Sequence, residues 1–137
     1  MNGQDFDIRV LGTGGIEDHH AHLLRLGYLD RCLFFSVGND DRAVDAHCLR
    51  LLAAQAILIG VYENGRVRAS VEIVPDRTAS RGQATLIAEP GFQSDALAAA
   101  LIERAQAEAK KHGLSRLDFV GMTGTPQTIR AQMARLA

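Results

Sequence analysis

The stretch from Ala84 to Gly113 combines, in order, a short apolar strand, the pair Pro90-Gly91 and a long alanine-rich helix that opens on polar residues. The first backbone amides of a helix have no partner within the helix, and they point beyond its N-terminus. Together with the helix dipole, such amides can bind an anion. The negative charge of Asp95 would repel an anion there, so the sequence predicts the geometry of an anion site and leaves its use open.

Two histidines near the start of the chain, His19 and His22, are three residues apart and share one face of a predicted helix. A metal site would need two further ligands with suitable geometry, and the next candidates, His47 and Cys48, belong to a different helix. We therefore expect no metal site, and we expect histidines on the surface. Neither Cys48 nor Cys32 lies in a Cys/His motif, so both are interpreted as reduced, half-buried thiols.

Hydrophobic periodicity predicts the elements of the first half of the chain. Alternating apolar residues favour a strand at about residues 5–11, and the glycines that follow break it. Apolar positions from Ile16 onward, with acidic residues in the first turn, predict a helix, and residues 40–54 have the spacing of a second amphipathic helix. Between the two we expect a connecting segment, residues 28–39, in which Phe34-Phe35 packs into the core.

The clearest local signal is a β-hairpin. Residues 57–62 are typical of a buried strand, and Asn64-Gly65 favours a type I′ turn because both of its positions need positive φ. The apolar residues of the segment 67–73 alternate with polar ones, which predicts a strand with one buried face. A polar loop at residues 75–82 then precedes a third strand at about 83–89.

A strand–helix–strand unit follows the hairpin. Its helix extends from about residue 94 to 112, with Gly113 suited to the C′ position, and a short strand begins at Leu117. Such a unit implies a right-handed crossover and a parallel pair of strands. Thr125-Pro126, as N-cap and first helical position, predicts a last helix. Since the sequence contains no repeat and no linker, we expect its 137 residues to form a single domain.

The composition argues for a soluble, cytoplasmic protein and against two classes of partner. The chain is 47% hydrophobic and 23% charged, and its formal net charge is −1. That charge gives no electrostatic basis for binding nucleic acid or an anionic membrane. No apolar run approaches the roughly 18–20 residues that span a bilayer, and the N-terminus lacks the profile of a signal peptide.

The order of elements resembles the fold of the Gcn5-related N-acetyltransferases, the acyl-coenzyme A (CoA) N-acyltransferases. In that family the third hairpin strand ends in a Val-Asp-Pro-like bulge, and a Gln/Arg-x-x-Gly-x-Gly/Ala loop opens the long helix. Residues 87–98, IAEPGFQSDALA, fit this pattern with Ala96 in place of the first glycine. Residues 22–35 are similar to the first-helix region of some members. The resemblance implies an α/β fold with a mixed, mostly antiparallel sheet flanked by helices, and without the usual last two strands.

The resemblance also implies a reaction and its site. Acetyl-CoA is the expected co-substrate, with its pantetheine arm between the parting strands and its pyrophosphate at the helix N-terminus. The acceptor is a primary amine of a small molecule or a protein, and it attacks the thioester directly. The residues expected to bind the co-substrate are Ala88, Gln93, Ser94, Asp95, Ala96, Leu97 and Ala98. The catalytic candidates are Glu89, Glu72 and Tyr28.

Each catalytic candidate has a simpler interpretation. Glu89 lies at the bulge, where an acidic residue often only caps the following turn. Glu72 points away from the buried side of its strand, which is equally typical of a solvated carboxylate. Tyr28, like Tyr62, is a candidate acid for the leaving thiolate, although half-buried packing is the ordinary role of such a tyrosine.

Three hypotheses follow. The first is an acetyl-CoA-dependent N-acyltransferase. The second is a non-catalytic relative that acts as a CoA-binding, regulatory or dimerisation module. It is favoured by Asp95 and Ala96, and by Gln83 and Met133 at positions where many members have an acidic residue and a tyrosine. The third is an unrelated α/β ligand-binding domain. The strand near residues 117–121 would have an exposed edge, which a homodimer could cover.

Overall fold

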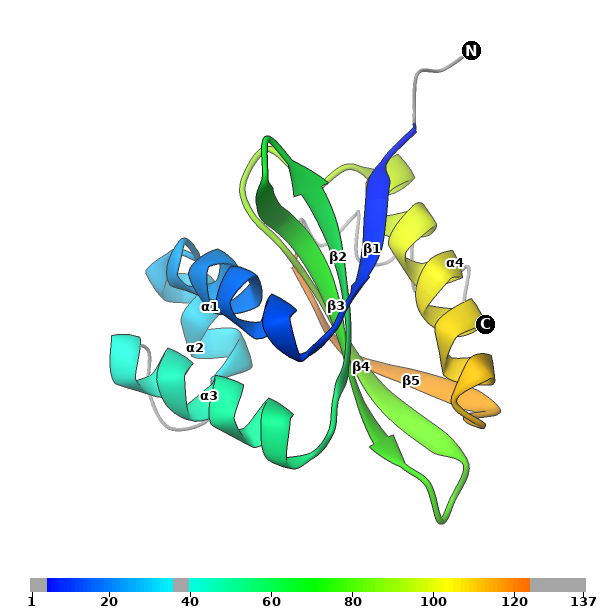
Figure 1. The fold of residues 1–137 in the computed structure, drawn as a ribbon. Helices are drawn as coiled ribbons and strands as arrows, with labels where there is room; N and C mark the ends of the chain where they lie inside the picture. Colours follow the sequence, from blue (N-terminus) through cyan, green and yellow to red (C-terminus); the bar gives the residue numbers. More distant parts are fainter. Residues whose placement is uncertain (1–4, 36–39, 124–137) are drawn as a thin grey trace.

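The computed structural model describes residues 5–35 and 40–123. Its elements, in chain order, are β1 (Asp7–Leu11), a 3-10 turn (Thr13–Gly15), α1 (Ile16–Leu24), α2 (Tyr28–Phe34), α3 (Asp41–Ala53), β2 (Ile57–Glu63), β3 (Arg66–Asp76), β4 (Arg81–Ala88), α4 (Asp95–Lys111) and β5 (Arg116–Met122) (Figure 1).

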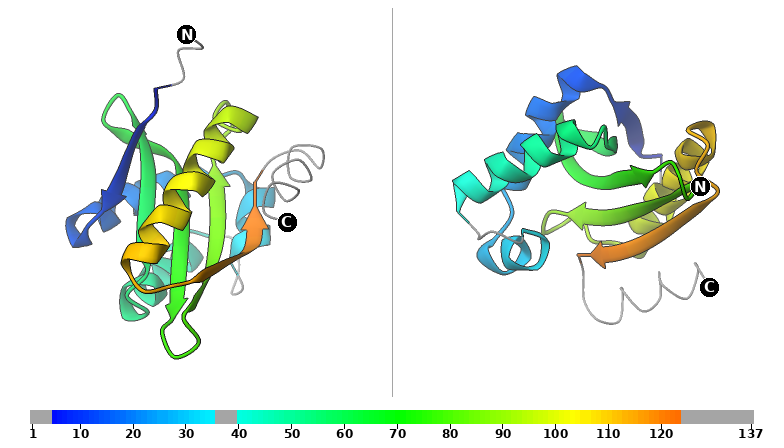
Figure 2. Two further views of the ribbon diagram at one scale, coloured as in Figure 1. Left: turned by 90° about the vertical axis from the view of Figure 1, so that its right-hand side faces the viewer. Right: turned by 90° about the horizontal axis from the view of Figure 1, so that it is seen from below.

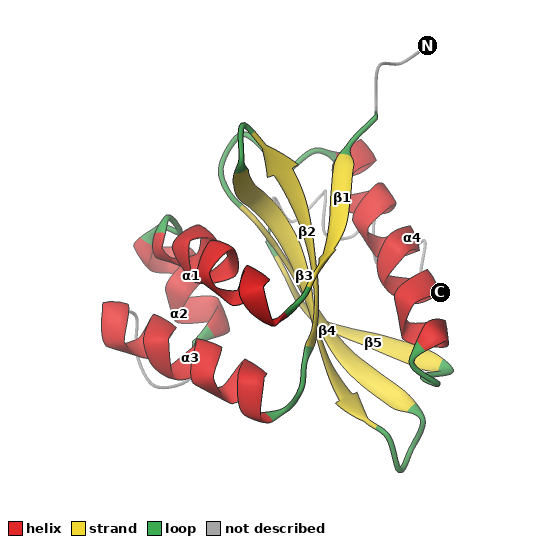
Figure 3. Ribbon diagram, viewed as in Figure 1, coloured by secondary structure: helices red, strands yellow, loops and turns green. Residues whose placement is uncertain are grey.

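The strands form one sheet in the order β1-β2-β3-β4-β5. Neighbouring strands are antiparallel except for β4 and β5, which are parallel, as the strand–helix–strand unit predicts. Helices α1, α2 and α3 lie on one face of the sheet and α4 lies on the other (Figure 3). The prediction of a mixed, mostly antiparallel sheet flanked by helices is therefore confirmed.

The alternation of β3 divides its side chains between the two faces. Ala69, Val71 and Ile73 are fully buried in the core beneath α4, whose own Leu101 is also fully buried. Burial of one such aliphatic side chain contributes about 1.5–3 kcal/mol, so this layer fixes the register of β3. The residues between them face α1 instead, and Ser70 is among them.

A second, smaller core joins the three N-terminal helices to the sheet. Leu23 of α1, Val44 of α3 and Ile87 of β4 pack there with Phe35, and Phe34 lies against the same cluster, which confirms the packing expected for Phe34-Phe35. The expectation of a connecting segment over residues 28–39 is wrong for residues 28–34, because these form α2, and residues 36–39 lie outside the described residues.

The side chain of Arg31 explains how α2 is held in place. Its guanidinium donates hydrogen bonds to the backbone oxygens of Leu24 (2.6 Å) and Leu26 (3.2 Å) at the end of α1. The carbonyl of Leu24 lies in the last turn of α1, where it has no partner within the helix, so the side chain of Arg31 satisfies it together with the carbonyl of Leu26 just beyond the C-cap.

The hairpin formed by β2 and β3 has the predicted turn, but β3 ends later, and β4 begins earlier, than expected. Asn64 (φ 52°) and Gly65 (φ 76°) both have positive φ, as a type I′ turn requires. The polar loop predicted at residues 75–82 is shorter, because β3 continues to Asp76 and β4 begins at Arg81. The register of these strands pairs Asp76 with Arg81.

Helix α4 begins and ends as its sequence predicts. The hydroxyl of Ser94 accepts a hydrogen bond from the backbone amide of Leu97 and caps the N-terminus, and Gly113 has a φ of 77° just beyond the C-terminus. The chain then returns as β5, which lies in orange at one edge of the sheet (Figure 2). The last helix predicted from Thr125-Pro126, and Met133, lie outside the described residues.

Candidate functional site

A buried polar cluster lies between α1 and the sheet. His19 and His22 occupy one face of α1, and Arg25 follows one turn later as the C-cap residue. This stripe lies over the residues of β3 that face away from α4, which include Ser70 and Glu72. The helix period of three to four residues and the strand period of two therefore bring two polar rows into contact.

Glu72 is the centre of one half of the cluster, and only 4% of its surface is exposed. Its carboxylate lies 2.7 Å from Nε2 of His19 and 2.8 Å from Nε2 of His47, which α3 contributes. Because a carboxylate only accepts, both imidazoles donate through Nε2. Burial by itself would raise the pKa of Glu72, but the hydrogen bonds from His19 and His47 outweigh it and lower the pKa to about 2.

Glu89 is the centre of the other half of the cluster. Nδ1 of His22 lies 2.8 Å from its carboxylate, and Nε2 of the same ring lies 3.1 Å from the hydroxyl of Ser70. Burial lowers the pKa of His22 in spite of its hydrogen bond to Glu89, so the ring is neutral at pH 7. A neutral ring that donates through Nδ1 accepts through Nε2, and the hydroxyl of Ser70 is therefore the donor.

Two arginines hold Glu89 from the other side. Nε of Arg25 donates to both carboxylate oxygens, at 3.1 and 3.0 Å, and its Nη2 donates to the backbone oxygen of Val67. Arg68 approaches to 3.6 Å and stacks on the ring of Phe92. Burial would raise the pKa of Glu89, but the hydrogen bond from His22 and the hydrogen bond and charge of Arg25 lower it. Glu89 is therefore an ionised carboxylate at neutral pH.

These contacts correct three expectations from the sequence. His19 and His22 are not surface histidines, because both are fully buried. Glu72 faces away from the α4 core as predicted, but α1 and α3 cover it, so it is not a solvated strand carboxylate. Of the two thiols expected to be half-buried, Cys32 is exposed and Cys48 is buried.

The order Ser70–His22–Glu89 has the connectivity of a nucleophile, a base and an orienting carboxylate. In this fold all three side chains are buried beneath α1, where no substrate meets Ser70. The ionised carboxylates of Glu72 and Glu89 also have pKa values below the near-neutral range that suits a general base. The cluster is thus best suited to fixing α1 and α3 against the sheet.

The end of β4 is the second polar location. Backbone pairing with β5 ends where the amide of Thr123 donates to the oxygen of Leu86, and β4 continues to Ala88. The amide of Ala88 donates to the hydroxyl of Thr123 at 2.7 Å, and its oxygen accepts from the side-chain amide of Gln93 at 2.9 Å. Both backbone groups of this residue are thus bonded to side chains rather than to a neighbouring strand.

The residues expected to bind the co-substrate lie together at this end of β4. The chain turns through Pro90-Gly91, where Gly91 has a φ of 89°, and enters α4. Ser94, Asp95 and Ala96 are exposed at the helix N-terminus, whereas the remaining two residues face inward and are buried: Leu97 and Ala98. Whether these residues bind a ligand stays a prediction.

The three catalytic candidates do not form one site. Glu72 and Glu89 belong to the two halves of the buried cluster, where they fix α1 and α3. Tyr28 is 69% exposed at the start of α2, so it does not have the half-buried packing expected of it, and it makes none of the hydrogen bonds of the cluster. Their catalytic roles stay predictions.

Most residues that contact Glu72, Glu89 or Ala88 in the buried cluster and at the end of β4 were not identified from the sequence. Arg25, Arg68, Ser70 and His47 were not assigned to a site, and Thr123 was not singled out. A usable signal for the cluster exists, because polar residues at i, i+3 and i+6 of α1 match polar residues at every second position of β3. The partner strand, however, lies more than 40 residues away in the sequence.

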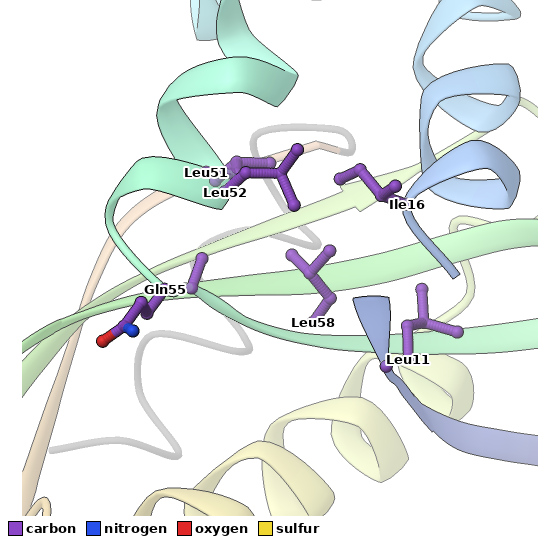
Figure 4. A pocket seen from close by; sticks show the side chains of 8 residues that line it. Leu11, Ile16, Leu51, Leu52, Gln55 and Leu58 are labelled. Carbon is purple, nitrogen blue, oxygen red and sulfur yellow. The ribbon is translucent and has the colours of Figure 1, made fainter. Parts of the chain in front are cut away.

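An apolar pocket of about 440 Å³ lies at the opposite end of β2 from the β4 terminus. Leu51 and Leu52 of α3 and Ile16 of α1 enclose it above Leu58, with the side chain of Gln55 at its rim (Figure 4). Its volume suits a small ligand, but its lining contains no titratable group and so offers no acid–base chemistry. No pattern in the sequence predicts this pocket.

The described residues, 5–35 and 40–123, contain neither a metal-binding cluster nor a helix that could span a membrane. In this part of the chain, no group of three or more His, Cys, Asp or Glu side chains is arranged to hold a metal ion. Nor does any described helix combine the length and apolar character that crossing a bilayer requires.

The chain matches no model of a known family, and no curated protein is a detectable relative. Its fold nevertheless matches solved structures. The GNAT domain of S. lividans PAT aligns with 98% of this chain and 80% of its own, at a TM-score of 0.69 and 14% identity. Ribosomal-protein-alanine N-acetyltransferase from Brucella melitensis biovar Abortus 2308 aligns with 97% of this chain and 92% of its own, at 0.66 and 18%.

A third solved structure, a predicted acetyltransferase from Clostridium acetobutylicum with acetyl-CoA, aligns with 96% of this chain and 88% of its own. Its TM-score is 0.64 and its identity is 15%. All three alignments extend over nearly the whole of this chain, including the parallel β4–β5 pair and the helix between them. The chain therefore has the fold of the Gcn5-related N-acetyltransferases.

Proposed function

We propose that this chain is an N-acyltransferase, which transfers the acetyl group of acetyl-CoA to a primary amine of a small molecule or a protein. The observation that carries the proposal is the end of β4. The strand continues to Ala88 after its last backbone pair with β5, and Pro90-Gly91 leads directly into the N-terminus of α4. Among the described residues, the backbone groups of Ala88 that face β5 bond to side chains and not to a strand. Such a strand edge beside a helix N-terminus suits a ligand that has amides in an extended arm and a pyrophosphate.

Similar structures support the proposal at the level of the fold. One is described with acetyl-CoA, and another is named for acetylation of an alanine of ribosomal proteins. Acetyl-CoA is therefore the first donor to test. The low identity of these proteins leaves the acceptor of this chain to be identified by experiment.

In the proposed reaction, the nitrogen of the acceptor attacks the carbonyl carbon of the thioester. A C–N bond forms, the C–S bond breaks, and CoA leaves as the thiolate. The amide of Ala88 would donate to the acyl oxygen, and the first amides of α4, from Ser94 onward, would hold the pyrophosphate. These groups bind and orient the donor.

The reaction also requires that the attacking amine lose a proton. Glu89 already accepts hydrogen bonds from Arg25 and His22, and its lowered pKa makes it a weak base, so we assign it to positioning those side chains. The acceptor then reacts as the neutral amine, and its proton passes to solvent. The rate should accordingly rise with pH up to the pKa of the acceptor amine.

The experiment is incubation with acetyl-CoA and a panel of primary amines, followed by chromatographic measurement of both free CoA and acetylated amine. Chromatography is preferable to a thiol reagent because the exposed Cys32 would itself react. Amine-dependent release of CoA with equal formation of the amide supports the proposal. Binding of acetyl-CoA without release of CoA for any amine would contradict it.

A second candidate function is a non-catalytic module that binds CoA weakly and acts in regulation or dimerisation. Two observations favour it. Thr123 and Gln93 already occupy both backbone groups of Ala88, and Asp95 places a carboxylate in the first turn of α4. Retention of the fold with CoA binding and no transfer is the outcome that this alternative predicts.

The homodimer and the cytoplasmic location stay predictions. Among the described residues, β5 pairs only with β4. Val120 of β5 lies where the register between the two strands shifts, and its side chain is exposed. We propose that a second copy covers this edge. Size-exclusion chromatography with light scattering tests the dimer, and a clean monomer at high concentration would count against it.

A further inference from the structure

Every second residue of β4 directs its backbone amide and carbonyl toward β5. Alternate residues of a strand direct both their amide and their carbonyl to the same side. Leu86 points toward β5, because its oxygen accepts from the amide of Thr123, so Ala88 also points that way. Among the described residues, no backbone group pairs with Ala88 on that side, so Ala88 offers one donor and one acceptor there.

Two side chains from different parts of the chain satisfy these two groups. The hydroxyl of Thr123, directly after β5, accepts from the amide of Ala88 at 2.7 Å. The side-chain amide of Gln93, in the turn before α4, donates to the oxygen of Ala88 at 2.9 Å. Thr123 is only 4% exposed, so its side chain is buried beside the edge of β4. An extended ligand that adds to this edge therefore meets two groups that are already bonded.

We propose that Thr123 and Gln93 are displaceable caps of the acyl-CoA site, and that the pantetheine arm must replace them to bind. This inference rests on the proposed function. The hydroxyl of Thr123 lies where the acyl oxygen would accept the hydrogen bond of Ala88, and Gln93 occupies the acceptor that an amide of the arm would use. The caps satisfy the edge in the free protein and reduce the affinity for the ligand.

The expected effect of each cap follows from the strength of one neutral hydrogen bond, about 1 kcal/mol net. Removing either cap should tighten acetyl-CoA binding by about fivefold, because the ligand no longer has to break that bond. The two caps are separate side chains bonded to different groups of one residue. Removal of both should therefore tighten binding further than removal of either one.

The experiment is calorimetric titration of acetyl-CoA, which carries the acyl oxygen, into the full chain and four single variants. Thr123→Ala removes one cap, and Thr123→Ser retains the hydroxyl. Gln93→Ala removes the other cap. Thr78→Ala makes a matched change at the far turn between β3 and β4, where the hydroxyl of Thr78 bonds to Asp76. We expect tighter binding for Thr123→Ala and Gln93→Ala, and parent-like binding for Thr123→Ser and Thr78→Ala.

The possible outcomes test the caps and the proposed function separately. If the parent binds acetyl-CoA and neither Thr123→Ala nor Gln93→Ala binds it more tightly, the caps are overturned and the proposed function stands. If neither the parent nor any variant gives heat at millimolar acetyl-CoA, the proposed function is overturned, and the displacement with it. Thermal melts show which variants are folded, and if Thr123→Ala is not, Gln93→Ala decides alone because its side chain is only partly buried.

Discussion

Substitution of Glu72 by Gln tests the buried cluster, because this one carboxylate joins α1 and α3 to β3. Its ionised form accepts from both His19 and His47, whereas the amide of a glutamine presents a donor to one of them. A fall in the pKa of Glu72 from its usual 4.5 to about 2 corresponds to stabilisation by about 3 kcal/mol. We expect Glu72→Gln to lower the free energy of unfolding at pH 7 by that order.

The assay is urea unfolding followed by circular dichroism, with Glu103→Gln on the exposed side of α4 as the matched control. A pKa that is lowered in the folded state gives stability above the unfolded pKa, and this stability is lost as the pH falls toward the folded one. The difference between the parent and Glu72→Gln should therefore be full at pH 7 and shrink below about pH 4.5. A variant within about 0.5 kcal/mol of the parent at pH 7, as surface changes typically are, would refute the cluster as described.

Three further predictions concern pH, the helix N-terminus and the thiols. Burial lowers the pKa of His22, so the unfolded chain takes up a proton that the folded chain does not, and stability should fall as the pH drops below about 6.5; equal urea midpoints at pH 7.5 and 5.5 would contradict this. The double variant Asp95→Gly, Ala96→Gly removes a negative charge and a methyl group from the start of α4 and should bind CoA more tightly in calorimetry, whereas unchanged affinity would show that these residues do not line the site. Thiol labelling followed by mass spectrometry should modify the exposed Cys32 rapidly and Cys48 only on unfolding, because burial raises the pKa of Cys48 to about 11; rapid labelling of both would be inconsistent with the packing of α3.

The sequence predicts those elements whose signals are local. Asn64-Gly65 defines the hairpin because its turn type needs two positive φ values, and Ser94 with Gly113 defines the two ends of α4. The parallel β4–β5 pair follows from the same short segment, since a strand, a helix and a strand in one sheet cross over in one sense. Most of the sheet was predictable for this reason.

The buried cluster was not predictable in the same way, because its contacts join distant parts of the chain. His19 and Glu72 are 53 residues apart, and His22 and Glu89 are 67 apart. Without the fold, a histidine near acidic residues is typical of a surface helix, and a glutamate that alternates with buried residues is typical of a solvated strand. The helix α2 was missed because its large apolar residues favoured a packed connecting segment.

The caps on Ala88 illustrate the same limit at the candidate site. The sequence located the end of β4 and the start of α4, but the partner of the Ala88 amide is a side chain 35 residues away. The hydroxyl of Thr123 carries no sequence signal for that role. Local patterns thus predict where the candidate site lies, and the contacts across the sheet determine which of its backbone groups are already hydrogen-bonded.

A titration of the 15N-labelled chain with CoA, followed by NMR, tests most directly whether CoA binds along the end of β4 and over the N-terminus of α4. We expect the largest amide shifts at Ala88 and from Ser94 to Ala98, with little change at Leu58 beside the apolar pocket. Shifts confined to the apolar pocket, or no shifts at millimolar CoA, would contradict it.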